Sequence, residues 1–455
     1  MRIRTHALLS ALGLGLVLAA AALFPVGLPG VVPFWATSSS AFALEDEEDL
    51  SVSEMGAALR SAVKDGVRSY AAKLVTALYE ESSPEGLVAI FNNALLGRDH
   101  ELERFVGKLL VGVEKRALRR TIFTHAAKNR SFRVRVILLA VVARWIDEEP
   151  NALETLHRAI ADPSKSVALT ALSWLAKAKK AESVDPLIEQ LARMEVKRRN
   201  RVYFDTLQLV RFITGAKLTE AADWKNYWEL RGKVIEKKEL TQRQERRTSV
   251  FRESPKFFTM SLNSDRVLFI VDISHSMLKR DPFLDERGRP VADESGVIER
   301  PQSRERLLRV KSELLRVIDN LPENTYFGIM TFSTDLHFWG ATPRLQRATM
   351  EAKESAKVWI SSLQAHGVTR TDRALAAALS MVEVDTIFLL TDGRPKAGGN
   401  VNIPIKDVMA MVRLKNRFRR CRINTIGFLS TGTAAMQSFV KLLAAQNDGT
   451  HHFLR

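Results

Sequence analysis

The chain has 455 residues, of which 46% are hydrophobic, so it is long enough for two or three domains with their own cores. Lys and Arg outnumber Asp and Glu by 68 to 52, a formal net charge of +16. The single cysteine, Cys421, excludes an internal disulfide and a cysteine-based metal site, and we expect it to be a small buried residue. The commonest sequence signatures of metalloproteases, serine hydrolases and nucleotide-binding loops do not occur.

Residues 1–43 are typical of a signal peptide. Two arginines precede an apolar stretch over residues 8–24, and the run Ser40-Ala-Phe-Ala43 offers an Ala-x-Ala cleavage pattern. We therefore expect an exported protein, periplasmic or extracellular, that is cleaved after Ala43. An uncleaved membrane anchor is the alternative, because the apolar length is near the lower bound for spanning a bilayer.

Residues 44–230 are predicted to be helical and repetitive. The run 162–175 followed by 184–191 has a turn, a helix with apolar spacing, a polar break and a second helix. An earlier unit, 129–145 with 151–160, has the same order at a comparable distance. This self-similarity resembles HEAT repeats, whose stacked helical pairs bury apolar faces against their neighbours and mostly present surface to other proteins. A non-repeating helical bundle is the alternative.

A charged connector over residues 231–260 is predicted to be a linker. Its most charged part, 231–252, has eight Lys or Arg against three Glu and lacks a continuous apolar stripe. In residues 261–455, patterns typical of strands alternate with patterns typical of helices. This alternation predicts an α/β doubly wound domain with a mostly parallel six-stranded sheet. The expected strands are 267–271, 325–333, 336–339, 386–390, 423–428 and 451–454, and the expected helices are 304–321, 346–363, 372–381, 405–418 and 434–445.

A polar cluster follows the first of these strands. The apolar run ends in Asp272, Ser274 and Ser276, which are spaced two residues apart. In open α/β sheets, ligands bind at the carboxyl ends of the strands. Carboxylate and hydroxyl oxygens, with no thiol or imidazole required, suit a hard cation such as Mg²⁺. The alternative is that both serines cap the following helix and Asp272 closes a turn.

The pattern Asp-x-Ser-x-Ser resembles the metal-ion-dependent adhesion site of the von Willebrand factor type A domain. The run 366–375 resembles the Gly-Gly-Thr loop of that family, which places Thr369 in the site. The run 386–395 is similar to the family's strand ending in Thr-Asp-Gly, which places Asp392 there. One departure is Val368, which stands where a second Gly is common and reduces backbone freedom beside Thr369.

This resemblance implies a site for Mg²⁺, with Mn²⁺ or Ca²⁺ as alternatives. In the family, residues at the positions of Ser274, Ser276 and Thr369 ligate directly, and those of Asp272 and Asp392 act largely through water. The remaining coordination position takes a carboxylate from a partner protein. We therefore expect an exported, non-enzymatic adhesion or scaffold protein that binds an acidic group of its partner, while its oligomeric state stays open.

The charge balance favours a second function, that of a polyanion or envelope-surface binder. Basic clusters occur at 115–120, 197–201 and 413–422. Aromatic residues that would stack bases are not interleaved with them, so we expect no specific nucleic-acid ligand. An accessory subunit of a metal chelatase-like complex is a further alternative, and so is a metal-assisted hydrolase with Asp392 as its base. The inserted stretch 279–303 is expected to be a flexible loop beside the metal site.

Overall fold

The computed structural model describes residues 50–195, 200–231, 255–285, 287, 289–292, 298, 300–398, 401–428 and 434–454. The predicted signal peptide and most of the predicted linker lie outside these residues. The chain divides into two compact units, Met1–Lys180 and Ala181–Arg455. The second unit therefore contains the last helices of the region 44–230 together with the α/β part. Across the described residues, no helix is both long enough and apolar enough to cross a membrane.

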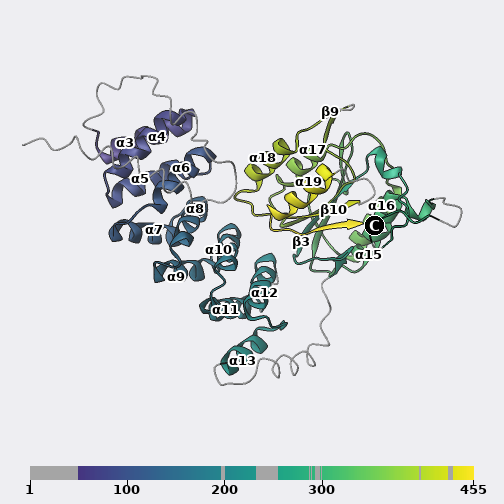
Figure 1. Ribbon diagram of the computed structural model, residues 1–455, viewed down its shortest axis with the longest axis horizontal. Coiled ribbons are helices and arrows are strands. Elements are labelled where there is room, and N and C mark those ends of the chain that lie inside the picture. The colour runs from purple at the N-terminus through teal and green to yellow at the C-terminus, as the bar shows by residue number, and fades with distance from the viewer. Residues whose placement is uncertain are drawn as a thin grey trace, which may run out of the picture. The chain divides into compact units, whose positions relative to one another are not determined.

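The described part of the first unit is built from helices that pack in two layers (Figure 1). Helices α5, α7 and α9 contact one another in turn, and so do α4, α6, α8 and α10. Because α7 also packs on α8 and α9 on α10, the arrangement is compatible with a HEAT-like solenoid, which remains a prediction. The helices are α3 (Val52–Asp65), α4 (Arg68–Glu80), α5 (Pro84–Ala94), α6 (His100–Val111), α7 (Arg116–Lys128), α8 (Phe132–Val142), η2 (Ala143–Trp145), α9 (Pro150–Ala159) and α10 (Lys165–Ala178).

Side-chain caps set the bounds of several of these helices. Ser51 and Glu54 form a reciprocal capping box at the start of α3, and Gly66 ends that helix with a φ of 76°. Asp99 caps α6 by accepting from the backbone N–H groups of Glu101 and Leu102. Helix α8 is apolar almost throughout, because it lies between α6 and α10 in one layer and also packs on α7.

The second unit begins with helices η3 (Ala181–Ser183), α11 (Val184–Glu195), α12 (Arg201–Thr214) and α13 (Ala221–Arg231), of which α11 packs against both α12 and α13. The α/β part follows. Its large sheet has seven strands in the order β11-β10-β7-β3-β4-β5, with β6 paired to β4, and two small hairpins, β1-β2 and β8-β9, lie outside it. The strands are β1 (Lys256–Phe257), β2 (Met260–Ser261), β3 (Arg266–Asp272), β4 (Tyr326–Phe332), β5 (Leu336–Phe338), β6 (Gln346–Arg347), β7 (Thr386–Leu390), β8 (Lys396–Gly398), β9 (Val401–Asn402), β10 (Arg422–Phe428) and β11 (His451–Leu454).

The large sheet is mostly parallel, as predicted, since only β5 and β6 run antiparallel to their neighbour β4. It has one strand more than the predicted six. The prediction that residues 346–363 are helical throughout is wrong at its start, because Gln346 and Arg347 pair with β4. The helix itself begins at Met350, after Thr349 caps it by accepting from the backbone N–H of Ala352.

Helices cover both faces of this sheet, so the doubly wound architecture is confirmed. Alternate residues of β3 enter different cores: Val267, Phe269 and Val271 lie in one, and Leu268 and Ile270 in the other. The first core is closed by helices α15 (Arg306–Asp319) and α16 (Met350–Ser362), and the second by α17 (Thr371–Ala378), α18 (Ile405–Asn416) and α19 (Ala434–Ala445). Cys421 is buried beside the second core, as expected.

Strands β3 and β7 lie side by side at the point where the strand order reverses. Asp272 is the last residue of β3, and Asp392 follows the end of β7 by two residues. The prediction that these two acidic residues leave adjacent strands at the topological switch point is therefore confirmed.

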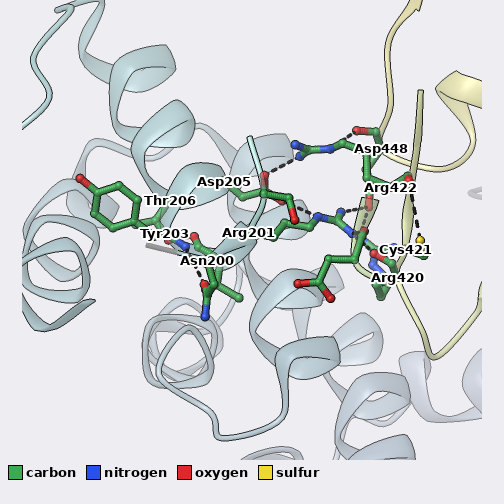
Figure 2. Close-up of polar contacts among 12 residues, drawn as sticks. Asn200, Arg201, Tyr203, Asp205, Thr206, Arg420, Cys421, Arg422 and Asp448 are labelled. Carbon is green, nitrogen blue, oxygen red and sulfur yellow. Dashed lines mark hydrogen bonds and ion pairs between the residues drawn. The ribbon is translucent and has the colours of Figure 1, made fainter. Parts of the chain in front are cut away.

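At the opposite, amino-terminal end of the strands, Arg201 of α12 is 1% exposed and joins this helix to the sheet (Figure 2). Its Nη1 donates to the backbone carbonyls of Asp385, just before β7, and of Arg420, just before β10. Its Nη2 lies 3.3 Å from Oδ2 of Asp448, and its Nε lies 3.4 Å from Oδ2 of Asp205. Burial lowers the pKa of the Arg201 guanidinium, so these partners are needed to offset the loss of water.

Candidate metal centre

The carboxylate of Asp272 is held by two strand ends. The residue is fully buried. Its Oδ1 accepts from the backbone N–H of Ser274 at 2.8 Å, which shapes the turn into the short helix η4 (His275–Leu278). Its Oδ2 accepts from Oγ1 of Thr391 at 2.8 Å, directly after β7. The first acidic residue is therefore fixed from both adjacent strands.

Three hydroxyl groups and the second carboxylate continue from this turn. Oγ of Ser274 lies 3.1 Å from Oγ of Ser276 and accepts from Oγ1 of Thr369 at 3.1 Å. Oγ of Ser276 donates to Oδ1 of Asp392 at 2.6 Å. The structure thus brings together all the residues that the sequence singled out, from three separated loops.

The loop that carries Thr369 is docked by its backbone. His366 donates its N–H to the carbonyl of Ile273 at 2.7 Å, and the carbonyl of Gly367 accepts from the N–H of His275 at 3.1 Å. Gly367 has a φ of 72°, and a Cβ there would lie 2.6 Å from Oγ1 of Thr334. The glycine at this position is therefore required, whereas Val368 does not keep Thr369 out of the site.

The site is poor in compensating positive charge around Asp272. Burial, and then the nearby charge of Asp392, raise the pKa of the Asp272 carboxyl to about 7. Its hydrogen-bond donors among the described residues are neutral, namely the backbone amide of Ser274 and the hydroxyl groups of Thr391 and Ser274. Neutral donors do not neutralise the negative charge of the ionised Asp272 carboxylate. A cation bound at the site would offset this charge.

Arg306 is a neighbour of the site that the sequence interpretation missed. Its Nη1 donates to Oδ2 of Asp392 at 2.6 Å. Its Nε and Nη2 donate to Oδ1 of Asp281 at 2.9 and 2.8 Å. A signal was present in the helical spacing: Arg306 precedes Val310 and Leu314 at steps of four, so it lies on the buried stripe of α15.

Asp281 belongs to the inserted stretch 279–303, which the sequence predicted to be flexible. Its start is tied to the residues that follow the insertion, by an isolated bridge between Arg280 and Glu305 and by the contact of Asp281 with Arg306. Other residues of the insertion, among them 293–297, lie outside the described part. The anchored end sits directly beside the candidate metal centre.

The donor set fits a small hard cation. At Mg²⁺–oxygen distances of about 2.1 Å, neighbouring oxygens of an octahedron lie about 3.0 Å apart. The two hydroxyl–hydroxyl distances of 3.1 Å that share Ser274 are close to this spacing. Gly393 leaves the necessary space, since a Cβ there would lie 2.9 Å from Oγ1 of Thr369. No three His, Cys, Asp or Glu side chains of the described residues are grouped to hold a metal, so any ion here would depend on the hydroxyls.

Comparisons with known proteins agree with this fold. Residues 299–453 match the model of the von Willebrand factor type A domain family, a span that includes Thr369 and Asp392 but begins after Ser276. The chain is 28% identical over 148 residues to von Willebrand factor A domain-containing protein 3A of Homo sapiens, and this match covers 32% of this chain and 12% of that protein. It is 31% identical over 104 residues to inter-alpha-trypsin inhibitor heavy chain H6 of Homo sapiens, covering 20% of this chain and 8% of that protein.

Among solved structures, one similar chain is the von Willebrand factor type A protein from Catenulispora acidiphila. It is 19% identical, with a TM-score of 0.31, and the match covers 42% of this chain and 38% of that one. The SpRpn10 VWA domain is 12% identical with a TM-score of 0.27, covering 41% of this chain and 86% of that one. The chain spans no more than 12% of the two sequence relatives named above.

Proposed function

Because the chain carries a von Willebrand factor type A domain, we propose that it is a protein-binding protein that holds Mg²⁺ and grips an acidic group of its partner. The observation that carries this proposal is the convergence of oxygens from Asp272, Ser274, Ser276, Thr369 and Asp392 at one edge of the sheet. When bound, Mg²⁺ would supply a hard electrophilic centre whose remaining waters a carboxylate can replace. Mn²⁺ or Ca²⁺ are the alternative ions.

Each residue has a role in this proposal. The hydroxyls of Ser274, Ser276 and Thr369 are the direct ligands, and they add no negative charge to the ion. Asp272 orients the turn through the Ser274 amide, and Asp392 orients the Ser276 hydroxyl by accepting a hydrogen bond from it. With few charged ligands the ion stays electrophilic, which favours an anionic partner group.

We also propose that the protein has no catalytic activity. A metal-assisted hydrolase needs a general base beside the ion. Asp392 is the residue placed for that role, and both of its oxygens are engaged, Oδ1 by Ser276 and Oδ2 by Arg306. The apolar stretch and cleavage pattern of residues 1–43 support an exported protein, in which the helical unit serves as a scaffold.

Affinity capture from the native envelope or culture fluid tests the proposal. The purified chain is used with Mg²⁺, with EDTA and as the Asp272→Ala variant, and an Asp335→Ala variant serves as control because Asp335 is an exposed residue just after β4. Partners held by the metal centre are lost in EDTA and with Asp272→Ala, and stay with Asp335→Ala. Partners retained equally in all arms contradict metal-bridged binding.

A second candidate function, polyanion binding, is favoured by a groove in the helical unit. The groove lies between α7 and α9 and has a volume of about 250 Å³. Two of its cations are engaged, Arg119 by Glu149 and Arg158 by Glu154. For its remaining cations the described residues provide no ion pair, and all of them are exposed: Arg116, Arg120 and Lys128.

Dextran sulfate is a suitable probe for this groove. Arg116→Gln/Arg120→Gln should weaken binding several-fold, whereas Arg98→Gln/Arg104→Gln removes the same charge elsewhere in the helical unit and should have little effect. Binding at the groove should fall steeply with salt and persist in EDTA. Equal losses for both double variants would mean that the net charge alone attracts the polymer.

A further inference from the structure

Arg306 is buried between two carboxylates that come from different parts of the chain. Its side chain is 3% exposed, and those of Asp281 and Asp392 are 2% and 0% exposed. Nη1 also lies 3.3 Å from the backbone carbonyl of Ser276, so the guanidinium touches the turn that carries the predicted ligands. A planar guanidinium with these contacts has its orientation fixed.

The charges alternate along this contact. Arg306 forms ion pairs with both Asp392 and Asp281. Asp281 forms a further ion pair with Arg309, whose Nη1 lies 3.2 Å from Oδ2 of Asp281. Within the described residues, the negative charge of Asp392 is therefore shared with a fixed cation, whereas that of Asp272 has only neutral donors. A divalent ion at the hydroxyl cluster would feel attraction from both aspartates and repulsion from Arg306.

We propose that Arg306 is a positioning residue that holds Asp392 in place and weakens the binding of a free divalent cation, so that cation and carboxylate ligand bind cooperatively. The inference rests on the proposed function. A positive charge a few Å from the ion in a poorly solvated site lowers its affinity by about tenfold or more. An anionic ligand adds the missing negative charge, and by linkage the ligand and the cation raise each other's affinity by the same factor.

The charges predict that replacing Arg306 and replacing Asp281 change the Mn²⁺ affinity in opposite directions. Mn²⁺ affinity of the full chain, measured by calorimetry and by electron paramagnetic resonance of the bound ion, should rise about tenfold in Arg306→Gln. It should fall several-fold in Asp281→Asn, because the repulsion by Arg306 is then less compensated. The double variant Arg306→Gln/Asp281→Asn keeps a hydrogen-bonding pair without charge and should give an intermediate affinity.

Acetate is the probe for the carboxylate ligand, compared with chloride at equal ionic strength. Acetate should tighten Mn²⁺ binding in the wild type by a larger factor than in Arg306→Gln, where the free cation already binds well. Circular dichroism and thermal unfolding without metal show whether each variant is folded. If Arg306→Gln does not fold, Asp281→Asn should still bind Mn²⁺ more weakly than the wild type, and the double variant should bind it more tightly than Asp281→Asn.

The outcomes separate the inference from the function on which it rests. If the wild type binds Mn²⁺ and both single variants bind it more weakly, Arg306 has only a structural role and the inference is overturned. If Mn²⁺ binds to no variant, with or without acetate, the proposed metal centre itself is wrong. If Mn²⁺ binds to the wild type only with acetate and to Arg306→Gln without acetate, the proposed metal centre and the inference about Arg306 are both supported.

Discussion

Oγ1 of Thr391 donates a hydrogen bond to Oδ2 of Asp272 at 2.8 Å, which joins the carboxyl ends of the two adjacent strands β7 and β3. Both residues are fully buried. A hydrogen bond to a charged group contributes more to the free energy of unfolding than one between neutral groups. Removing this bond should be more costly still, because the buried carboxylate then lacks one of its donors. This contact is therefore expected to stabilise both the sheet and the candidate metal centre.

Thr391→Val should lower the free energy of unfolding by about 2 kcal/mol, because the shape is kept and only the hydroxyl is lost. Thr386→Val is the matched control at the other end of β7, where the buried Oγ1 has no hydrogen-bond partner among the described residues. It should be neutral or slightly stabilising. Urea unfolding of both variants measures the difference, and equal effects would show that the Thr391 hydroxyl has no special role.

Gly367→Ala should destabilise the chain by about 2–3 kcal/mol, because a Cβ there is both strained by the left-handed backbone and too close to Thr334. Gly66→Ala is the control, since Gly66 has a φ of 76° but its Cβ would meet nothing within 4 Å. It should cost only about 1 kcal/mol. Thermal unfolding compares them, and Mg²⁺ titration should show weaker binding only for Gly367→Ala, which displaces the loop of Thr369.

Arg201→Gln should lower the free energy of unfolding by about 3 kcal/mol, because buried acceptors at the amino ends of β7 and β10 lose their donor. In Arg193→Gln, an exposed arginine of the preceding helix α11 is lost, and the expected change is below about 1 kcal/mol. Denaturant unfolding of the full chain measures both. Similar small effects would show that α12 is not held on the sheet by Arg201.

Asp99→Asn tests an ion pair between α4 and α6. Oδ1 of Asp99 caps α6 and Asn can keep this role, whereas Oδ2 meets Nε of Arg68 at 2.6 Å. Burial opposes ionisation of Asp99, but the bonds from Arg68 and the two backbone amides lower its pKa below the usual value. With Arg68 38% exposed, solvent screening reduces the expected contribution to about 0.5–1 kcal/mol.

The sign of the pH dependence follows from this lowered pKa. The folded state binds the proton less well than the unfolded state, so the stabilisation is complete above the unfolded pKa of about 3.9 and is lost as the pH falls through the folded pKa. The difference in unfolding free energy between wild type and Asp99→Asn should therefore be present at neutral pH and vanish in strong acid. A difference that is independent of pH would assign the effect to helix capping.

Much of the α/β fold could be predicted because its strands are short apolar runs with turns between them. Strand β7 has the predicted bounds, and β3 includes the whole predicted run 267–271. The short strand β6 was missed, since two residues without an apolar pattern form it only by pairing with β4. Pairing of this kind depends on tertiary contacts that periodicity does not encode.

The candidate site residues were predictable because each one lies within a few residues of a strand end or a helix start, where a short motif marks it. Arg306 and Asp281 were not, because a contact between residues 25 positions apart follows from the path of an insertion and not from spacing. Arg201 is similar: apart from Asp205 in its own helix, its partners lie 184 to 247 residues away in sequence. Buried ion pairs between distant segments have no local pattern, apart from the position of an arginine on an otherwise apolar helix stripe.

A calorimetric titration of the full chain with Mg²⁺ tests the central claim most directly, with Thr369→Val and Thr386→Val as a matched pair. Thr369 donates to Ser274 within the oxygen cluster, and Thr386 is a buried threonine at the far end of the sheet. The wild type and Thr386→Val should bind one ion with equal affinity, and Thr369→Val should bind it at least about tenfold more weakly, since a direct ligand is lost. No binding of Mg²⁺ or Mn²⁺ to the wild type, or equal affinity in Thr369→Val, would contradict the account.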